Sequence, residues 1–215
     1  MKLELIILAC LFLFSCSEEI TYKLENITKY DRINTTITRT ESGYTITSYS
    51  DPQEKFYDGE QIEVFSKNGS SLGFFKKDFL EQVKIDGSGV LEGEDTRFLH
   101  YDFSVDDNIT YYLADYSLGA WDNKLNNWTQ EKPSIAIKPP LEHDTKIRIR
   151  SVGPNDNPAW VNDLLLSKTF YVDDKFYGVG NEKRIDIYVG LQKSKTTIGR
   201  PESLLIHNVT IKIIE

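Results

Sequence analysis

The sequence lacks the groups on which several common kinds of active site depend. Only two of its 215 residues are cysteine, Cys10 and Cys16, and both lie near the N-terminus. The three histidines are widely scattered, and the glycines form neither a nucleophile elbow nor a phosphate-binding loop. A zinc site needs closely spaced histidines or cysteines, an α/β-hydrolase needs the nucleophile elbow, and a P-loop protein needs the phosphate-binding loop. We therefore expect no metal site and no organic cofactor.

Positive charge is also scarce. The chain has 25 Lys and Arg against 33 Asp and Glu, which gives a net charge of −8. Proteins that bind nucleic acid gather positive charge on one face, so no nucleic-acid partner is expected. Apolar residues make up 40% of the chain. That share is enough to close a hydrophobic core, which argues against a disordered chain.

No apolar run is long enough to cross a bilayer as a helix. Residues 5–14 form a run of ten, whereas a spanning helix needs about 20. A run of this length fits the apolar part of a secretion signal. It ends in Leu13-Phe14-Ser15-Cys16, which resembles the lipobox of bacterial lipoproteins. We expect residues 1–15 to be a signal peptide and Cys16 to carry a lipid anchor. The alternative is an ordinary secretion signal that happens to end near a cysteine.

The residues behind the expected anchor bear on location. Ser17 gives no reason to expect retention in the inner membrane, and Glu18-Glu19 resembles a surface-export signal of bacterial lipoproteins. A plain solvated linker would look the same. We expect an outer-membrane location, and either face of that membrane fits the sequence.

The body of the chain has the pattern of a mainly β protein. Short alternating runs are separated by turn residues, as in strands, and Asn68-Gly69 indicates a hairpin. A short helix is predicted over residues 77–83, and five prolines exclude long helices from the second half. So many short runs favour a barrel or a sandwich. The predicted strands are residues 44–47, 61–65, 71–75, 135–137, 146–149, 170–172, 185–189 and 209–214.

Two acidic positions form the strongest candidate for a site. Asp173-Asp174 ends an apolar strand, and a second strand carries Asp186 between Ile185 and Ile187. Alternation places Asp186 on the face opposite those isoleucines. Burial of that face would raise a carboxyl pKa and keep the group protonated, as a general acid requires. The pattern alone leaves a functional and a purely structural interpretation open.

Four segments, taken in order, resemble the 3D domain, which is named for three aspartates and occurs in membrane-bound lytic transglycosylases. Residues 134–149 resemble the segment that holds the first aspartate. Residues 172–190 resemble the segment "D-T-G-G" and the strand that carries the third aspartate. Weaker matches cover residues 79–101 and 113–119. The resemblance spans about residues 60–190, and it is the order of the segments that makes it specific.

The resemblance implies a six-stranded double-psi β-barrel over residues 59–192 with a groove that cleaves peptidoglycan glycan strands. Residues 16–58, rich in Thr, Ser, Tyr and Asp, are then a tether or a small β-rich segment, and residues 193–215 a C-terminal strand extension. Asp174 matches the catalytic acid/base, and Asp186 matches the third aspartate. The resemblance also implies substrate contacts at Thr145, Tyr101 and Gly89. No cofactor is implied, and a monomer is expected.

Two departures from the family pattern define a rival hypothesis. Lys138 replaces the first aspartate, and Lys175-Phe176-Tyr177-Gly178 replaces a loop rich in glycine. An ammonium group near Asp174 would lower the pKa of that carboxyl and make it a poor proton donor. The chain is then either a lytic transglycosylase or an inactive relative that binds glycan or a partner protein. In either case we expect Asp186 to accept backbone N–H bonds and to orient the Asp174 loop.

Overall fold

The computed structural model describes residues 37–93, 97–103, 110–176, 182–194 and 204–215. The expected signal peptide, Cys16 and residues 17–36 of the segment behind it lie outside these ranges, so the expectations for them stay predictions. Within these ranges, the structure contains no helix with the length and apolar character needed to cross a membrane.

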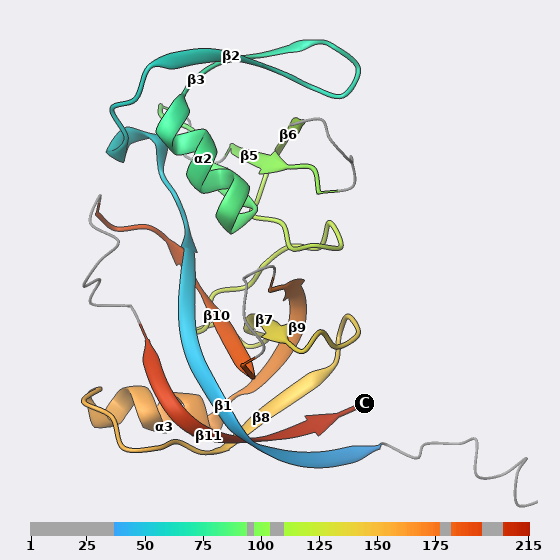
Figure 1. Ribbon diagram of the computed structural model, residues 1–215, viewed down its shortest axis with the longest axis vertical. Helices are drawn as coiled ribbons and strands as arrows, with labels where there is room; N and C mark the ends of the chain where they lie inside the picture. The colour runs from blue at the N-terminus through green and yellow to red at the C-terminus, as the bar shows by residue number, and fades with distance from the viewer. Residues whose placement is uncertain (1–36, 94–96, 104–109, 177–181, 195–203) are drawn as a thin grey trace, which may run out of the picture. The chain divides into compact units, whose positions relative to one another are not determined.

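Six strands of the mainly β structure pair in a closed ring, in the order β1-β10-β7-β9-β8-β11 (Figure 1). The pairs β1–β10 and β7–β9 are parallel, and the other four are antiparallel. The six strands are β1 (Thr38–Asp51), β7 (Ser134–Lys138), β8 (Lys146–Ser151), β9 (Thr169–Lys175), β10 (Arg184–Leu191) and β11 (Leu205–Ile214).

Alternating aliphatic residues fill the ring. Ile147 and Ile149 on β8, and Ile185 and Ile187 on β10, are buried, whereas their neighbours in sequence are more exposed. Each fully buried side chain of this size contributes about 1.5–3 kcal/mol of hydrophobic stabilisation. Helix α3 (Ala159–Ser167) packs against β8 and adds Leu165 to the same core. The helix is short, as the prolines predicted.

A smaller part of the structure lies between β1 and β7 in sequence. It holds a 3-10 turn η1 (Glu54–Phe56), the hairpin of β2 (Gln61–Phe65) and β3 (Ser71–Lys76), helix α2 (Lys77–Asp86), and a sheet of β4 (Ser88–Val90), β5 (Phe98–Tyr101) and β6 (Tyr111–Ala114). Helix α2 buries Phe79, Leu80 and Val83 in a separate core. It ends at Gly87, whose φ of 87° is readily adopted only by glycine.

The predicted hairpin, helix and strands are all present, but the ring takes its residues from a wider part of the chain than expected. Strand β1 comes from the segment expected to be a tether or a small β-rich segment, and β11 comes from the expected C-terminal strand extension. Residues 61–114, which were expected inside the barrel, form the smaller sheets instead. The first half of β1 is exposed and rich in threonine. Its few aliphatic residues therefore hid a long strand from the sequence pattern.

Candidate functional site

Two aspartates lie on the same face of the ring, one strand apart. Asp174 on β9 is paired with Ala136 on β7, and Ala136 is paired with Asp186 on β10. Directly paired residues project their side chains to the same side of a sheet. Since neighbouring strands are about 4.8 Å apart, the two aspartate backbones are separated by roughly 10 Å, with a small side chain between them.

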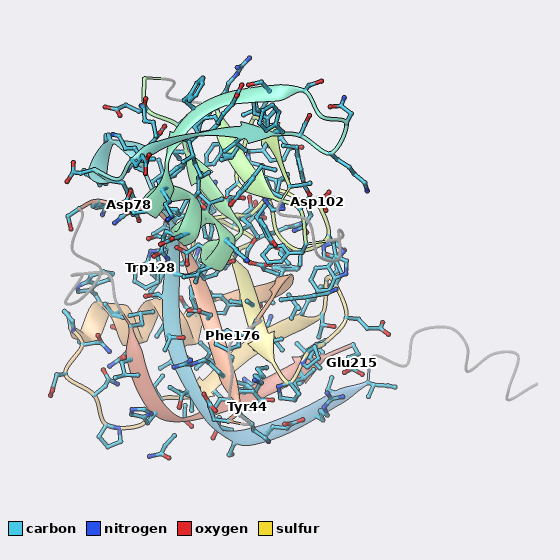
Figure 2. All side chains as sticks on the ribbon, turned by 45° about the horizontal axis from the view of Figure 1, so that its top comes forward. Tyr44, Asp78, Asp102, Trp128, Phe176 and Glu215 are labelled. Carbon is cyan, nitrogen blue, oxygen red and sulfur yellow. The ribbon has the colours of Figure 1, made fainter. Side chains whose placement is uncertain are left out.

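Both aspartates line one pocket of about 310 Å³. One wall comes from the six-stranded barrel. The other comes from the end of α2 and from Phe103, which follows β5. Phe176 directly follows β9 and lies over the barrel strands in the view of Figure 2. The other described lining residues are Tyr49, Lys84, Ile85, Asp86, Phe103, Ala136 and Lys175. The two aspartates that stood out in the sequence thus line the same pocket.

Asp174 is held by three hydrogen-bond donors. Its Oδ1 accepts the backbone N–H of Ala120 at 3.0 Å and that of Lys175 at 2.8 Å, and its Oδ2 accepts the hydroxyl of Tyr49 at 2.8 Å. Burial raises the pKa of Asp174 to about 6, although these three bonds favour the ionised form and act in the opposite direction. The group is thus oriented, half-buried and able to exchange a proton near neutral pH.

Asp186 is half-buried, and its surroundings differ from the expectation. Its Oδ1 is shielded from solvent and has no hydrogen-bond partner among the described residues. Burial raises the pKa of Asp186 to about 6, against a hydrogen bond from Thr47 and the charge of Arg184. The expectation that Asp186 accepts backbone N–H bonds is therefore wrong for the described part of the chain. Those donors serve Asp174, because the loop that supplies one of them packs against β9.

Gly119 explains how that loop comes so close. A Cβ atom at Gly119 would collide with the backbone carbonyl oxygen of Asp173. The absence of a side chain lets residues 117–120 lie directly on β9, with the N–H of Ala120 aimed at Asp174. The sequence pattern showed a glycine here but gave no sign of the strand it approaches.

Another carboxyl group near these residues is fully buried. Asp51, the last residue of β1, accepts a hydrogen bond from Ser117 at 2.8 Å and another from the hydroxyl of Tyr188. Burial raises the pKa of Asp51 to about 8. The ring of Tyr188 packs on that of Tyr49, with centroids 5.4 Å apart. Sequence reasoning missed Asp51 and Tyr49 because both belong to the segment that was expected to lie outside the barrel, as a tether or a small β-rich segment.

The three expected substrate contacts are not among the described residues that line this pocket. Gly89 is buried on β4, where a Cβ would collide with Phe79 and Val83 of α2, which indicates a packing role. Tyr101 packs against the core under α2. Thr145 is buried just before β8. Their roles in substrate binding stay predictions.

Lys138 does not have the electrostatic effect that was expected of it. Its Nζ lies 5.9 Å from the centre of the Phe176 ring, and its partner across the sheet, Arg184, lies over the same ring at 5.2 Å. The pKa of Asp174 is raised to about 6 by burial, and Lys138 is not among the main causes of this shift. A lowering of the pKa by Lys138 is therefore not the dominant effect on Asp174.

One group of described side chains has the geometry for a metal ion. One ligand atom each from His143, Asp144 and Asp173 lie within 4.8 Å of one another. Asp173 is already engaged, since it accepts the hydroxyl of Ser134 at 2.6 Å and faces His143 at 3.4 Å. None of these residues is among those that line the pocket between Asp174 and Asp186.

A larger pocket of about 460 Å³ adjoins the site. Phe103 lines both pockets, and Ala120, whose N–H binds Asp174, lines the larger one. Asp102, labelled in Figure 2, also lines it. Four aromatic rings, including the buried imidazole of His100, contribute to its walls.

No protein-family model and no curated protein sequence matches the chain. Among solved structures, the chain is similar to Escherichia coli MltA with bound chitohexaose, with 11% identity, 80% of this chain and 71% of that chain covered, and a TM-score of 0.45. It is also similar to the apo-2 form of the E. coli lytic transglycosylase MltA-D308A, with 10% identity, the same coverage and a TM-score of 0.42. The lytic transglycosylase LtgG of Burkholderia pseudomallei has 12% identity, 81% and 72% coverage, and a TM-score of 0.41.

Proposed function

We propose that this protein cleaves the glycan strands of peptidoglycan as a lytic transglycosylase, with Asp174 as its acid and base. The observation that carries the proposal is the pocket shared by Asp174 and Asp186, in which Asp174 is oriented by three donors. The segments that resemble the 3D domain supply the same assignment for Asp174. The double-psi connection of the six strands is part of this proposal.

The chemistry needs only one carboxyl group. Protonated Asp174 donates its proton to the glycosidic oxygen that leaves C1 of the muramoyl residue, and the C1–O bond breaks to give an oxocarbenium ion. The C6 hydroxyl of the same sugar then attacks C1. Asp174, now a carboxylate, takes the hydroxyl proton as the 1,6-anhydro ring closes. Asp174 ends protonated, and water is not consumed.

The environment of Asp174 suits this cycle. A general acid works best when its pKa lies near the working pH, and burial raises the pKa of Asp174 to about 6. About a tenth of the molecules then carry the proton at pH 7, and about nine-tenths carry it at pH 5. The three donors stabilise the carboxylate that forms when the proton leaves. Phe103 and Phe176 provide apolar faces for sugar rings.

The test is mass spectrometry of purified sacculi digested with the protein. The wild type should release muropeptides that end in 1,6-anhydro-muramic acid, and Asp174→Asn should release at least a hundredfold less, the usual scale for a lost general acid. Asp173→Asn is the matched control, because Asp173 lies next in sequence but binds Ser134 instead of lining the pocket. Anhydro products that are absent, or equal with Asp174→Asn, would refute the proposal.

A binding protein without turnover is the second candidate. Lys175 and Phe176 belong to the segment that replaces the family's glycine-rich T-G-G, and both line the pocket, so they reduce the space for substrate. A pull-down on purified sacculi separates the two functions. Tight binding with no anhydro product would favour the inactive binding protein.

The expected location is part of the proposal. The lipobox-like Leu13-Phe14-Ser15-Cys16 would attach the protein to the outer membrane by a lipid on Cys16, within reach of peptidoglycan. Cys16→Ala should leave the protein unlipidated and move it from the membrane fraction to the soluble fraction. Unchanged fractionation together with an unchanged mass would exclude the anchor.

A further inference from the structure

The carboxyl group of Asp186 has an unfilled acceptor position at the pocket. Its Oδ1 is shielded from solvent and lacks a hydrogen-bond partner among the described residues, while the residue itself lines the pocket beside Asp174. A buried acceptor that is left unpaired destabilises a protein, and more so when it is charged. Most such groups in proteins are paired. A site that keeps this one unpaired is suited to a ligand that brings a donor.

The atoms around this oxygen restrict the kind of donor. Ala136 is the cross-strand neighbour of Asp186 on the same face, and Phe176 and the largely exposed Ile85 line the same pocket. A hydroxyl group would use only the carboxylate. An acetamido group would use both the carboxylate and the apolar side chains around it, because its amide N–H lies beside a methyl group. The terminal torsion of aspartate is soft, so a small rotation brings the unpaired oxygen to the ligand.

We propose that Asp186 recognises the 2-acetamido group of a bound sugar, its carboxylate accepting the amide N–H while Ala136 contacts the methyl group. This inference rests on the proposed glycan-cleaving function and adds the substrate feature that the pocket reads. It makes Asp186 a residue of substrate specificity. Asp174 alone carries the proton transfers.

A pair of oligosaccharides tests the acetamido group directly. Chitohexaose carries it on every sugar, and cellohexaose has a hydroxyl in its place. Calorimetry is done with Asp174→Asn, which removes cleavage, and with the double variant Asp174→Asn/Asp186→Ala. We expect Asp186→Ala to weaken chitohexaose binding by about tenfold or more, the usual effect of losing a hydrogen bond to a charged group.

Cellohexaose is the control ligand. It should bind Asp174→Asn more weakly than chitohexaose does, and Asp186→Ala should leave its affinity unchanged. A loss of affinity in Asp186→Ala for chitohexaose alone indicates a direct contact, whereas an equal loss for both sugars indicates a general disturbance of the pocket. Equal affinities for the two sugars, or an equal loss of affinity for both in the double variant, would overturn the inference. So would undetectable binding of chitohexaose.

A second measurement does not require Asp186 to be replaced. Accepting an amide N–H stabilises the carboxylate, so binding should release protons at pH 6, close to the pKa of Asp186. About half a proton is available for each ligand bound. Titration of Asp174→Asn in two buffers of different ionisation enthalpy measures this release. The other charged groups that line the pocket are Lys84 and Asp86 from α2 and Lys175 from β9.

The variant Asp174→Asn/Asp186→Asn keeps the shape of the side chain and removes its proton. The release should vanish in it, while the charged groups on α2 and β9 stay in place. An unchanged release would assign the proton to one of those groups and overturn the inference. Thermal melting of each variant confirms that the fold is intact.

The outcomes distinguish this inference from the function it rests on. If chitohexaose binding depends on Asp186 but sacculi yield no anhydro products, the recognition site stands and the lytic reaction fails. If sacculi are cleaved but replacing Asp186 does not change the affinity for chitohexaose, the lytic reaction stands and the recognition site fails.

Discussion

The hydrogen bond from Tyr49 to Asp174 gives the sharpest test of how the pocket controls its acid. The hydroxyl of Tyr49 lies 2.8 Å from Oδ2 of Asp174 and favours the ionised form of that carboxyl. Tyr49→Phe removes the donor and leaves the ring packed against Tyr188. A hydrogen bond to a buried charged group is worth about 1.5–3 kcal/mol. Since one pKa unit corresponds to about 1.4 kcal/mol, the pKa of Asp174 should rise by about one to two units.

Two consequences follow for activity. The rate should stay high up to a pH about one to two units above the wild-type midpoint near 6, because the acid keeps its proton longer. The maximum rate should fall, because the carboxylate that Asp174 becomes when it donates its proton has lost one of its stabilising hydrogen bonds. The pH profile of anhydro-muropeptide release and the titration of the Asp174 carboxyl carbon by NMR measure the two effects.

Tyr188→Phe is the matched control. It removes a buried hydroxyl that binds a carboxyl group, but that group is Asp51, which does not line the pocket. The pKa of Asp174 should therefore change little in Tyr188→Phe. A midpoint that falls or stays unchanged in Tyr49→Phe, or that moves equally in both variants, would refute the assignment of this bond as a control on the acid.

Two further predictions concern stability. Burial gives Asp51 a pKa of about 8, so the folded state keeps a proton that the unfolded state releases. Stability should then fall by about 2 kcal/mol from pH 6 to pH 8, and Asp51→Asn should flatten this dependence, as melting curves at both pH values would show. Gly119→Ala would force a Cβ against the carbonyl of Asp173; it should cost about 1–3 kcal/mol in chemical denaturation. If Asp51→Asn keeps the full slope, or Gly119→Ala melts like the wild type, the corresponding argument is wrong.

The elements that the sequence predicted correctly are those defined by their own neighbours. The alternation around Ile185 and Ile187 specifies a strand with one buried face, and residues 184–187 of β10 alternate in this way, whereas residues 188–190 are all buried. Helix α2 follows from the spacing of Phe79, Leu80 and Val83 and ends where Gly87 allows a positive φ. Such signals depend on a few consecutive residues, so a single sequence contains them in full.

The closure of the ring could not be predicted in this way. It depends on β1, which joins β10 and β11, and pairing between strands so far apart leaves no local mark. Threonine on the exposed half of β1 suits a strand as well as a linker. The same limit applied to the site: Asp174 and Asp186 were found from their own strands, whereas Tyr49 and Ala120 reach Asp174 from elsewhere in the chain.

The case of Lys138 shows why spacing alone misjudges electrostatics. The ammonium group was expected to act on Asp174 because it replaces an acidic residue of the family. In the six-stranded barrel, however, it is Ala136 that pairs with Asp174. Lys138 lies two positions further along β7, roughly 6.6 Å away along the strand. Lys138 and Arg184 both face the ring of Phe176. Burial therefore dominates the pKa of Asp174, and the substitution at position 138 does not by itself argue for an inactive protein.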